Sequence, residues 1–314
     1  MNADPITFDY STKTSVESAL RISMTILFEK DMCSRGRSGS IEWAGVRNAS
    51  PCGLVFLPPL IGGKASHQIG MFRWLTRKGY DLISFNYSGH GNTSGRFCLA
   101  ATLRDTECML AHAHHLASRR GIPLFGIAPC YSAIPLLYSA DRLKEPLQGI
   151  VLINAVLRLN PGAVIRSFWA HYRKMFPAQI GIRKCLTALA HYADFLFPGI
   201  RKGRDRFGIL ERKRVRLCAT LADFLTLDPL EWIQLQKTRV LCLYARQDRI
   251  LKVYDGGAGT DYKDDVSRVC PRALFKTLDG DHFFSHQMTR DRVAMHIKAF
   301  LQTNGVFILD RSEE

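Results

Sequence analysis

Residues 123–135 constrain the fold of this chain more than any other segment, because they predict a strand that turns sharply into a helix. An apolar run, Ile122–Ile127, predicts a buried strand, and the pentapeptide APCYS at 128–132 follows it directly. Small residues two before and two after Cys130 suit a turn that holds a nucleophile in strained backbone, since larger side chains would collide with the neighbouring strand and helix. A free cysteine can also simply pack in a core. The rest of the chain must therefore supply an acid, a base and an oxyanion hole.

Composition sets the class of protein. The chain has 314 residues, 46% hydrophobic and 23% charged, which is typical of a soluble globular protein with a large core. No apolar run approaches the roughly 20 residues of a membrane-spanning helix, and the first residues do not resemble a signal peptide. Nine cysteines without C-x-x-C or Cys/His pairs of metal-ligand spacing argue against zinc and against a disulfide framework. We therefore expect a protein of the reducing cytoplasm with no metal or other cofactor.

Positive charge is concentrated in one part of the chain. The formal net charge is +15, and the segment from Arg158 to Arg216 has 14 Lys and Arg against 3 Asp and Glu, a net charge of +11. The remaining 255 residues carry only +4. Such an asymmetry indicates a surface that attracts acidic partners.

Strands and helices are expected to alternate along the chain. Two β-like stretches, Ala19–Ile26 and Ser40–Val46, flank the turn Arg35–Gly39 and predict an antiparallel hairpin at a sheet edge. Further strands are expected at 52–57, 80–85, 122–127, 149–155, 238–244 and 273–278, with helical patterns at 68–78, 102–119, 133–143, 165–175, 182–197 and 290–302. This order predicts an α/β fold with a doubly wound, mostly parallel sheet, whose ligands bind beyond the carboxyl ends of the strands. The expected organisation is a core in two parts, 1–157 and 236–314, with a basic helical insertion at 158–235.

Two residues later in the chain complete a candidate catalytic set. Asp248 ends the strand and turn that begin at Leu241, and His282 follows the strand expected at 273–278. A nucleophile needs a base within hydrogen-bond reach, and the base needs a third group to fix its tautomer. Taken alone, Asp248 is better explained as a helix N-cap or a surface turn residue, and His282 could be a turn histidine. The nearby alternatives are Asp279 and Asp281 for the acid and His286 for the base. The order nucleophile, acid, histidine, each just past a strand, favours Cys130, Asp248 and His282.

A family resemblance follows from these motifs. Residues 72–95, FRWLTRKGYDLISFNYSGHGNTSG, are similar to the G-[FY]-x-V-x-x-x-D-x-R-G-H-G-x-S-x-G signature of serine aminopeptidase-like and monoacylglycerol lipase-like proteins. With the elbow and the order of the three candidate residues, residues 52–302 resemble the α/β-hydrolase superfamily. The resemblance implies the α/β-hydrolase fold, a helical cap inserted at 158–235, and a Cys130–His282–Asp248 triad.

The elbow itself resembles several branches of that superfamily. Ser132 and Ala133 after the nucleophile make it similar to the acyltransferase of bacterial luminescence systems, which takes fatty acyl groups from acyl-carrier protein with a serine. Cysteine at this position is a feature of dienelactone hydrolases and of α/β-hydrolase-fold acyltransferases that move acyl groups between carrier domains in nonribosomal peptide assembly. The choice among these branches stays open.

The expected oxyanion hole departs from the family pattern. The family usually has His-Gly-x after its third strand, whereas this chain has Pro58 and Pro59 followed by Leu60 and Ile61. A backbone N–H can serve as a donor whatever the side chain, proline excepted. The family alignment leaves Leu60 or Ile61 as one donor, and Tyr131, next to the nucleophile, supplies the other.

A cysteine nucleophile favours thioester chemistry. A thiolate paired with imidazole attacks acyl carbonyls readily, and exchange between two thioesters is close to thermoneutral. The leading hypothesis is an acyltransferase or thioesterase that acts on acyl-carrier-protein or acyl-CoA thioesters through a Cys130 acyl-enzyme. One alternative is a lipase- or esterase-like hydrolase of lipid esters. The other is a noncatalytic binding protein, which the missing elbow glycines and the two prolines would suit.

The basic insertion suggests partners. Acyl-carrier protein is strongly acidic and coenzyme A carries phosphates, so either would be attracted to a cap of this charge. An anionic membrane surface is a rival, because apolar residues lie among the charges, namely Phe168, Trp169, Phe195 and Phe197. A solvated helical face is the third possibility. Nucleic acid is not expected, since no recognition motif accompanies the charge.

Overall fold

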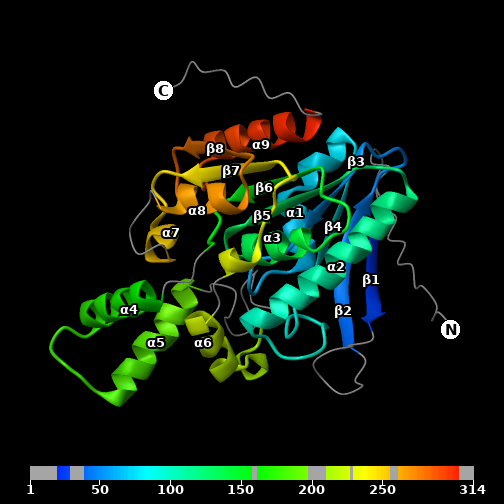
Figure 1. The fold of residues 1–314 in the computed structure, drawn as a ribbon. Coiled ribbons are helices and arrows are strands. Elements are labelled where there is room, and N and C mark those ends of the chain that lie inside the picture. The colour runs from blue at the N-terminus through cyan, green and yellow to red at the C-terminus, as the bar shows by residue number, and fades with distance from the viewer. Residues whose placement is uncertain are drawn as a thin grey trace.

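The computed structural model describes residues 20–28, 39–157, 161–196, 210–226, 229–254 and 261–303. Within these residues eight strands form one sheet with the order β1-β2-β4-β3-β5-β6-β7-β8, in which β2 is antiparallel to both neighbours and the other pairs are parallel. The strands are β1 (Leu20–Phe28), β2 (Gly39–Arg47), β3 (Gly53–Leu57), β4 (Tyr80–Phe85), β5 (Leu124–Pro129), β6 (Gly149–Ile153), β7 (Val240–Ala245) and β8 (Ala273–Leu278). The expected mostly parallel sheet and its antiparallel edge hairpin are confirmed (Figure 1). Of the expected turn at 35–39, only Gly39 lies within the described residues.

Helices cover both faces of the sheet and create two cores. β3, β4, β6 and β7 are buried at every residue, as parallel strands between two helical layers should be. Along β3, Leu54 and Phe56 face one core while Val55 and Leu57 face the other, which is the two-residue period of a strand. The first core is closed by α2 (Leu99–Arg119), α3 (Ala133–Asp141) and α8 (Asp261–Val269), and the second by α1 (Ala65–Met71), η1 (Arg73–Lys78) and α9 (Gln287–Gln302).

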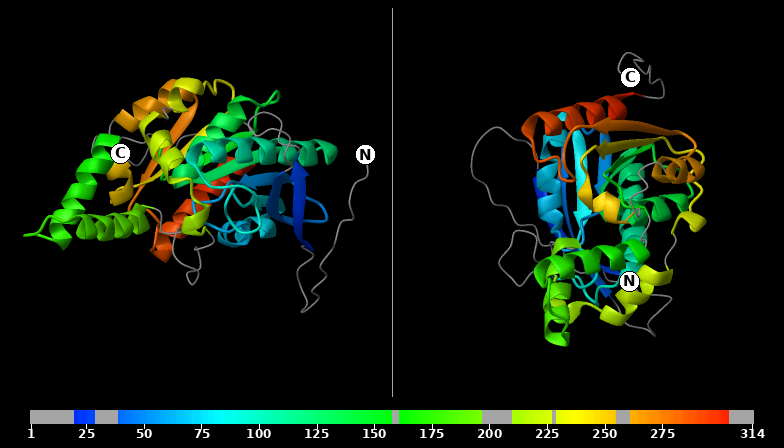
Figure 2. Two further views of the ribbon diagram at one scale, coloured as in Figure 1. Left: turned by 90° about the horizontal axis from the view of Figure 1, so that it is seen from below. Right: turned by 90° about the vertical axis from the view of Figure 1, so that its left-hand side faces the viewer.

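The insertion between β6 and β7 contains α4 (Pro161–Met175), α5 (Ile182–Leu196), η3 (Arg212–Arg214), α6 (Leu217–Thr226) and η4 (Pro229–Trp232). The helices expected at 165–175 and 182–197 fall on α4 and α5, with residue 197 outside the described residues. α4 and α5 form a hairpin that projects from the body of the molecule (Figures 1 and 2). No helix among the described residues has the length and apolar character needed to cross a membrane.

The carboxyl ends of the parallel strands meet at one edge of the sheet. The short helices η2 (Cys130–Ser132) and α7 (Arg249–Tyr254) begin there, directly after β5 and β7. The turns after β3, β4 and β8 lie at the same edge because these strands run parallel to β5 and β7. All of the predicted site residues are therefore brought to one side of the molecule.

Candidate active site

Cys130 lies at the turn between β5 and α3. It has a φ of +52°, in the left-handed region that non-glycine residues rarely adopt. Backbone of this kind costs about 1 to 3 kcal/mol and persists only where the surroundings enforce it. Ala128 and Ser132, the small residues on either side, are fully buried, and the Ser132 hydroxyl donates to the carbonyl of Pro129 at 2.6 Å. The half-buried Cys130 side chain lines a cavity, so the strained turn presents its sulfur to a space that a ligand can enter.

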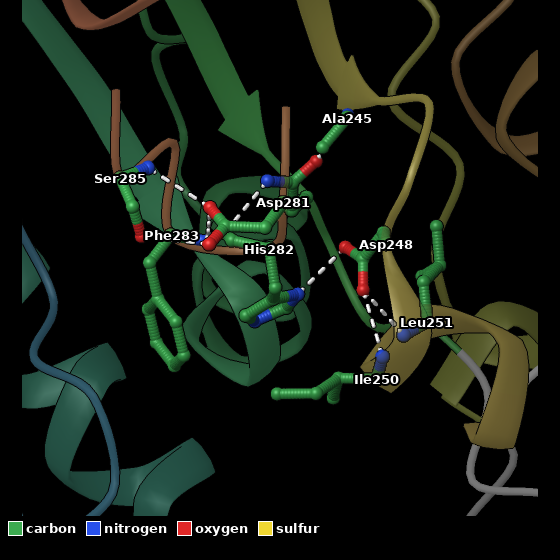
Figure 3. A network of polar contacts seen from close by, with 9 residues as sticks. Ala245, Asp248, Ile250, Leu251, Asp281, His282, Phe283 and Ser285 are labelled. Atoms are coloured by element: carbon green, nitrogen blue, oxygen red, sulfur yellow. Dashed lines mark hydrogen bonds and ion pairs between the residues drawn. The ribbon is translucent and has the colours of Figure 1, made fainter. Parts of the chain in front are cut away.

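Asp248 and His282 come together although 34 residues separate them in the chain. Nδ1 of His282 lies 2.6 Å from Oδ2 of Asp248, and both side chains are buried (Figure 3). Oδ1 of Asp248 accepts the N–H groups of Ile250 and Leu251, at 2.9 and 2.8 Å, in the first turn of α7. The carboxylate therefore caps a helix with one oxygen and orients the imidazole with the other.

The His282 ring interacts with Cys130 as well as with Asp248. Burial lowers the pKa of His282, but the charge of a Cys130 thiolate and the hydrogen bonds to Asp248 and Cys130 outweigh it and raise the pKa to about 10. Because Nδ1 bonds the carboxylate, Nε2 is the nitrogen left to exchange a proton with the thiol. The ring can therefore take the proton of a nucleophile and keep it at neutral pH.

The other acids and the second histidine of this region have different contacts. Asp279 forms an exposed ion pair with an arginine at 3.1 Å. Asp281 accepts the N–H and the hydroxyl of Ser285, at 2.9 and 2.7 Å, and so closes the turn that follows β8 (Figure 3). His286 occupies the N-cap position of α9. Among the described residues, Asp248 is the acid that contacts the imidazole.

The two alternative oxyanion donors share one turn after β3 but face different surroundings. The N–H of Gly63 closes this turn by donating to the carbonyl of Leu60 at 2.8 Å. Leu60 lines the same cavity as Cys130, whereas the side chain of Ile61 is buried in an apolar cluster. Tyr131 is the second residue of η2, where backbone N–H groups have no acceptor inside the helix. These positions favour the N–H groups of Leu60 and Tyr131 as an oxyanion pair.

Comparisons with known proteins bear on the fold. No protein-family model matches the chain, and no curated protein matches it in sequence. An esterase of Pyrococcus furiosus superimposes with a TM-score of 0.60 at 13% identity, over 95% of this chain and 97% of that one. A carboxyl esterase of Bacillus coagulans in complex with glycerol gives 0.60 at 12% identity, over 91% and 98%. A hydrolase of Pseudomonas aeruginosa gives 0.58 at 17% identity, over 89% and 98%.

The strand order and these matches agree. The chain has the α/β-hydrolase fold. In this fold a nucleophile is exposed on a strained strand-to-helix turn, and its partners follow in the order acid then histidine. Cys130, Asp248 and His282 have that order, and each follows a strand of the sheet.

His90 supports the candidate site of this α/β-hydrolase fold in a way that the sequence did not reveal. It is fully buried in the loop after β4, where its Nε2 accepts the N–H of Gly62 at 2.7 Å and its Nδ1 lies 3.2 Å from the carbonyl of Ser88. The ring must be neutral to accept at one nitrogen and donate at the other. Burial lowers the pKa of His90 to about 4 and so keeps it neutral. His90 thereby holds the turn that carries Leu60.

Asn154 is a second supporting residue that sequence reasoning missed. It follows β6 with a φ of +44° and is buried. Its Nδ2 donates to the carbonyl of His282 at 2.7 Å, and its Oδ1 accepts the N–H of Ala245 at 2.6 Å. The side chain therefore ties the histidine turn to the end of β7. An asparagine at the end of an expected strand was the available signal, but nothing local indicated its partners.

A cavity of about 560 Å³ leads from Cys130 and His282 into the space between α1–η1 and α9. Its walls are mainly apolar and include Leu60, Met71, Phe72, Trp74, Phe283 and Ile297. Both the volume and the lining are in the range of small-molecule sites. Within the described residues no group of three or more His, Cys, Asp or Glu could hold a metal ion. The cavity is suited to an apolar group attached to a reacting carbonyl.

Proposed function

We propose that the protein is an acyl hydrolase that cleaves carboxylic esters through a thioester on Cys130. The observation that carries the proposal is the imidazole of His282, held by Asp248 at 2.6 Å and hydrogen-bonded to Cys130. The esterases with the same fold support esters as the substrate class.

In the acylation step the Cys130 sulfur attacks the ester carbonyl carbon. Before the attack the thiol proton is already on Nε2 of His282, so the attacking group is a thiolate, while Nδ1–H stays bonded to Asp248. The N–H groups of Leu60 and Tyr131 stabilise the negative oxygen of the tetrahedral intermediate. When the C–O bond breaks, His282 protonates the leaving alcohol, and the acyl group remains on sulfur.

Deacylation reverses these roles. A water gives a proton to Nε2 of His282 as its oxygen attacks the thioester carbonyl. Collapse of the second intermediate breaks the C–S bond and releases the carboxylic acid. The sulfur leaves as a thiolate, and His282 keeps the proton from the water, which restores the starting pair. Asp248 keeps the ring oriented throughout because its own position is fixed by two N–H groups of α7.

The apolar cavity points to the acyl side of the substrate. Cys130 lines the cavity, so an acyl group bound to its sulfur has an apolar space next to it. Burial of each methylene there contributes about 0.8 kcal/mol, so activity should increase with acyl length until the chain fills the groove. Phe72, Phe283 and Ile297 are the walls that such a chain would contact.

A second candidate is acyl transfer from acyl-CoA or acyl-carrier protein. The observation that favours it is the sulfur nucleophile itself, because a thioester on Cys130 can exchange with another thiol at little cost in free energy. The two functions share the acylation step and differ in whether water or a second nucleophile receives the acyl group.

Intact-protein mass spectrometry with p-nitrophenyl esters tests the proposal. A butyrate, an octanoate and a palmitate ester should each give an acyl adduct on the wild type, with rapid release of nitrophenol. Cys130→Ala should lose the adduct and at least about a thousandfold of activity. Cys52→Ala is the matched control, because Cys52 is an exposed free thiol outside the cavity. Equal labelling of Cys130→Ala and wild type would reject the acyl-enzyme.

A further inference from the structure

The α4–α5 hairpin exposes an unusual set of apolar side chains. Ile180 in the connecting turn and Ile182 at the start of α5 are 95% and 83% exposed. Further along the two helices, four more apolar residues are about half exposed or more, namely Ile165, Trp169, Leu186 and Leu189. Soluble monomers rarely display contiguous apolar patches of this kind unless they are interaction sites. These exposed apolar side chains therefore mark the hairpin as a candidate interaction site.

These residues are not required to hold the hairpin together. Tyr172 and Tyr192 are buried between the helices, and the Tyr192 hydroxyl donates to the carbonyl of Val164 at 3.1 Å. The Tyr172 hydroxyl donates to the carbonyl of Gln179 at 2.9 Å and so fixes the turn. Ile182, Leu186 and Leu189 lie three or four residues apart, which places them on one outer face of α5. The hairpin thus has one apolar contact between its two helices and a second apolar face that is exposed to solvent.

Positive charge surrounds this face. From residue 159 to residue 193 the sequence contains no Asp or Glu, and it contains five cationic residues, Arg166, Arg173, Lys174, Arg183 and Lys184. Of these, all but Lys184 are exposed. An apolar face with a mainly cationic rim is complementary to an anionic lipid surface, where acyl tails receive the apolar groups and headgroups the charges.

We propose that the α4–α5 hairpin docks this protein on anionic lipid bilayers, with Ile180 and Ile182 inserted at the headgroup boundary. A second copy of the chain is a poorer occupant, because two faces that both carry a net positive charge would repel each other. An acidic protein would meet the charges but would have to enclose two nearly fully exposed isoleucines at the tip of a projecting hairpin. Phe195 and Phe197, which the sequence also places here, lie outside the described side chains.

The hairpin is connected to the site. α4 packs against α7, the helix whose first turn is capped by Asp248. A surface that binds through α4 and α5 would therefore lie near the edge of the sheet that carries Cys130. The inference stands apart from the hydrolase proposal, since docking requires neither Cys130 nor His282.

Vesicle cosedimentation tests the docking. We expect the full-length protein to pellet with vesicles of phosphatidylcholine and phosphatidylglycerol and to stay in solution with phosphatidylcholine alone. Replacing both Ile180 and Ile182 by Ser should weaken binding at least about tenfold, because each isoleucine loses a buried apolar side chain. Met288→Ser is the matched control, since Met288 is 74% exposed but lies on α9, away from the hairpin. Equal loss in both variants would overturn the proposal.

Charge supplies an independent test. The double variant Arg173→Glu and Lys174→Glu should lose most of its preference for phosphatidylglycerol, and added salt should weaken wild-type binding. Failure of the wild type to bind anionic vesicles would overturn the proposal. So would binding of an acidic acyl-carrier protein that depends on Ile180 and Ile182 in the absence of vesicle binding, which would assign the hairpin to a protein partner.

Activity separates this inference from the proposed function. The Ile180→Ser and Ile182→Ser variant should keep wild-type kcat/KM on a soluble p-nitrophenyl butyrate, because neither residue lines the cavity. Cys130→Ala should lose that activity and still bind vesicles. Loss of vesicle binding in Cys130→Ala would contradict a docking surface confined to the hairpin.

Discussion

Cys130 places a sulfur atom at the strand-to-helix turn that in this fold usually carries a serine hydroxyl. The consequence appears at His282, where a thiolate charge next to the ring adds to the hydrogen bond from Asp248 and outweighs the effect of burial. A histidine of this kind is protonated at neutral pH, and in the proposed mechanism it serves as an acid toward the leaving group. In a serine hydrolase, by contrast, the neutral ring must first act as a base.

The pH dependence of activity distinguishes these two states. We expect kcat/KM for an activated ester to stay level through neutral pH and to fall as the pH rises past about 10, because His282 then loses the proton that the leaving group needs. Cys130→Ser removes the thiolate charge, so the pKa of His282 should decrease and activity should increase with pH through the neutral range. Initial rates corrected for spontaneous hydrolysis measure both profiles. A wild-type rate that increases steeply through pH 7 would show that the neutral ring is the active form.

The pKa of His90 is lowered on folding, whereas that of His282 is raised, and the lowered pKa makes stability depend on pH. Folding lowers the pKa of His90 from 6.5 to about 4, so the unfolded chain binds this proton first as the pH falls. Above about pH 6.5 the ring is neutral in both states and contributes no pH dependence. Between about pH 6.5 and pH 4 the free energy of unfolding should decrease by up to about 3 kcal/mol on account of this residue. Denaturant unfolding at a series of pH values measures the decrease.

His90→Gln is the control for that prediction. The amide oxygen of glutamine can accept the N–H of Gly62 in place of Nε2, and the side chain does not titrate. All other titratable groups are the same in the two proteins. The difference between their losses of unfolding free energy below pH 6.5 therefore gives the contribution of His90. If the free energy of unfolding of His90→Gln decreased just as steeply between pH 6.5 and pH 4, another group would dominate acid unfolding.

At the scale of elements, the last part of the insertion is fastened to the loop that carries His90. Arg214 of η3 donates to the carbonyls of Gly91 and Thr93, the first at 2.6 Å. A backbone bridge joins His90 to Leu210 in the same region. The basic residues of the insertion therefore have two roles, since Arg214 bonds the core while four of the five in α4 and α5 are exposed to solvent.

Replacing Arg214 tests this attachment. Arg214→Met should reduce the free energy of unfolding by about 2 to 3 kcal/mol, because two partly buried carbonyls lose a charged donor. Lys213→Met is a control from the adjacent position, since Lys213 makes an exposed ion pair with Glu211 and its loss should leave stability nearly unchanged. Chemical unfolding of the three proteins provides the comparison. Equal stability of Arg214→Met and wild type would show that the insertion is held elsewhere.

Element prediction from sequence succeeded where the pattern was local. β8 has the expected residues, because an apolar run between turn signals specifies a strand without reference to its neighbours. The single helix expected at 68–78 is instead α1 followed by η1, and α2 begins at Leu99 rather than Thr102. α6, α7 and α8 were not expected. α7 has only 6 residues, and the sequence of α8, DYKDDVSRV, has too few apolar positions to show a helical period.

At the scale of the whole molecule, the strand alternation predicted the sheet, and the chain order predicted which ends carry the candidate triad. The supporting contacts could not be predicted. Gly62 and His90 are 28 residues apart, and Asn154 and His282 are 128 apart, so their pairing depends on which strands lie side by side. The projecting hairpin was equally hidden, because its exposed isoleucines look in sequence like an ordinary apolar face.

The concentration of positive charge in one segment should change how the rate of substrate binding depends on salt. A net +11 between Arg158 and Arg216 creates a field that attracts phosphates of coenzyme A but not an uncharged ester. We expect kcat/KM for an acyl-CoA to fall about tenfold between low and high salt, while the value for a p-nitrophenyl ester of the same acyl group stays constant.

Two charge reversals locate the source of that field. The variant Arg173→Glu and Lys174→Glu should lose most of the salt dependence for acyl-CoA, because these residues lie in the positive insertion. The variant Arg119→Glu and Arg272→Glu changes the net charge equally but in the body of the molecule, where both residues are exposed, and should retain it. Equal effects of the two variants would mean that total charge, rather than its concentration in the insertion, governs the approach of anionic substrates. If kcat/KM for the uncharged ester depended on salt in the same way, salt would be acting on the chemical steps and not on the binding of the charged substrate.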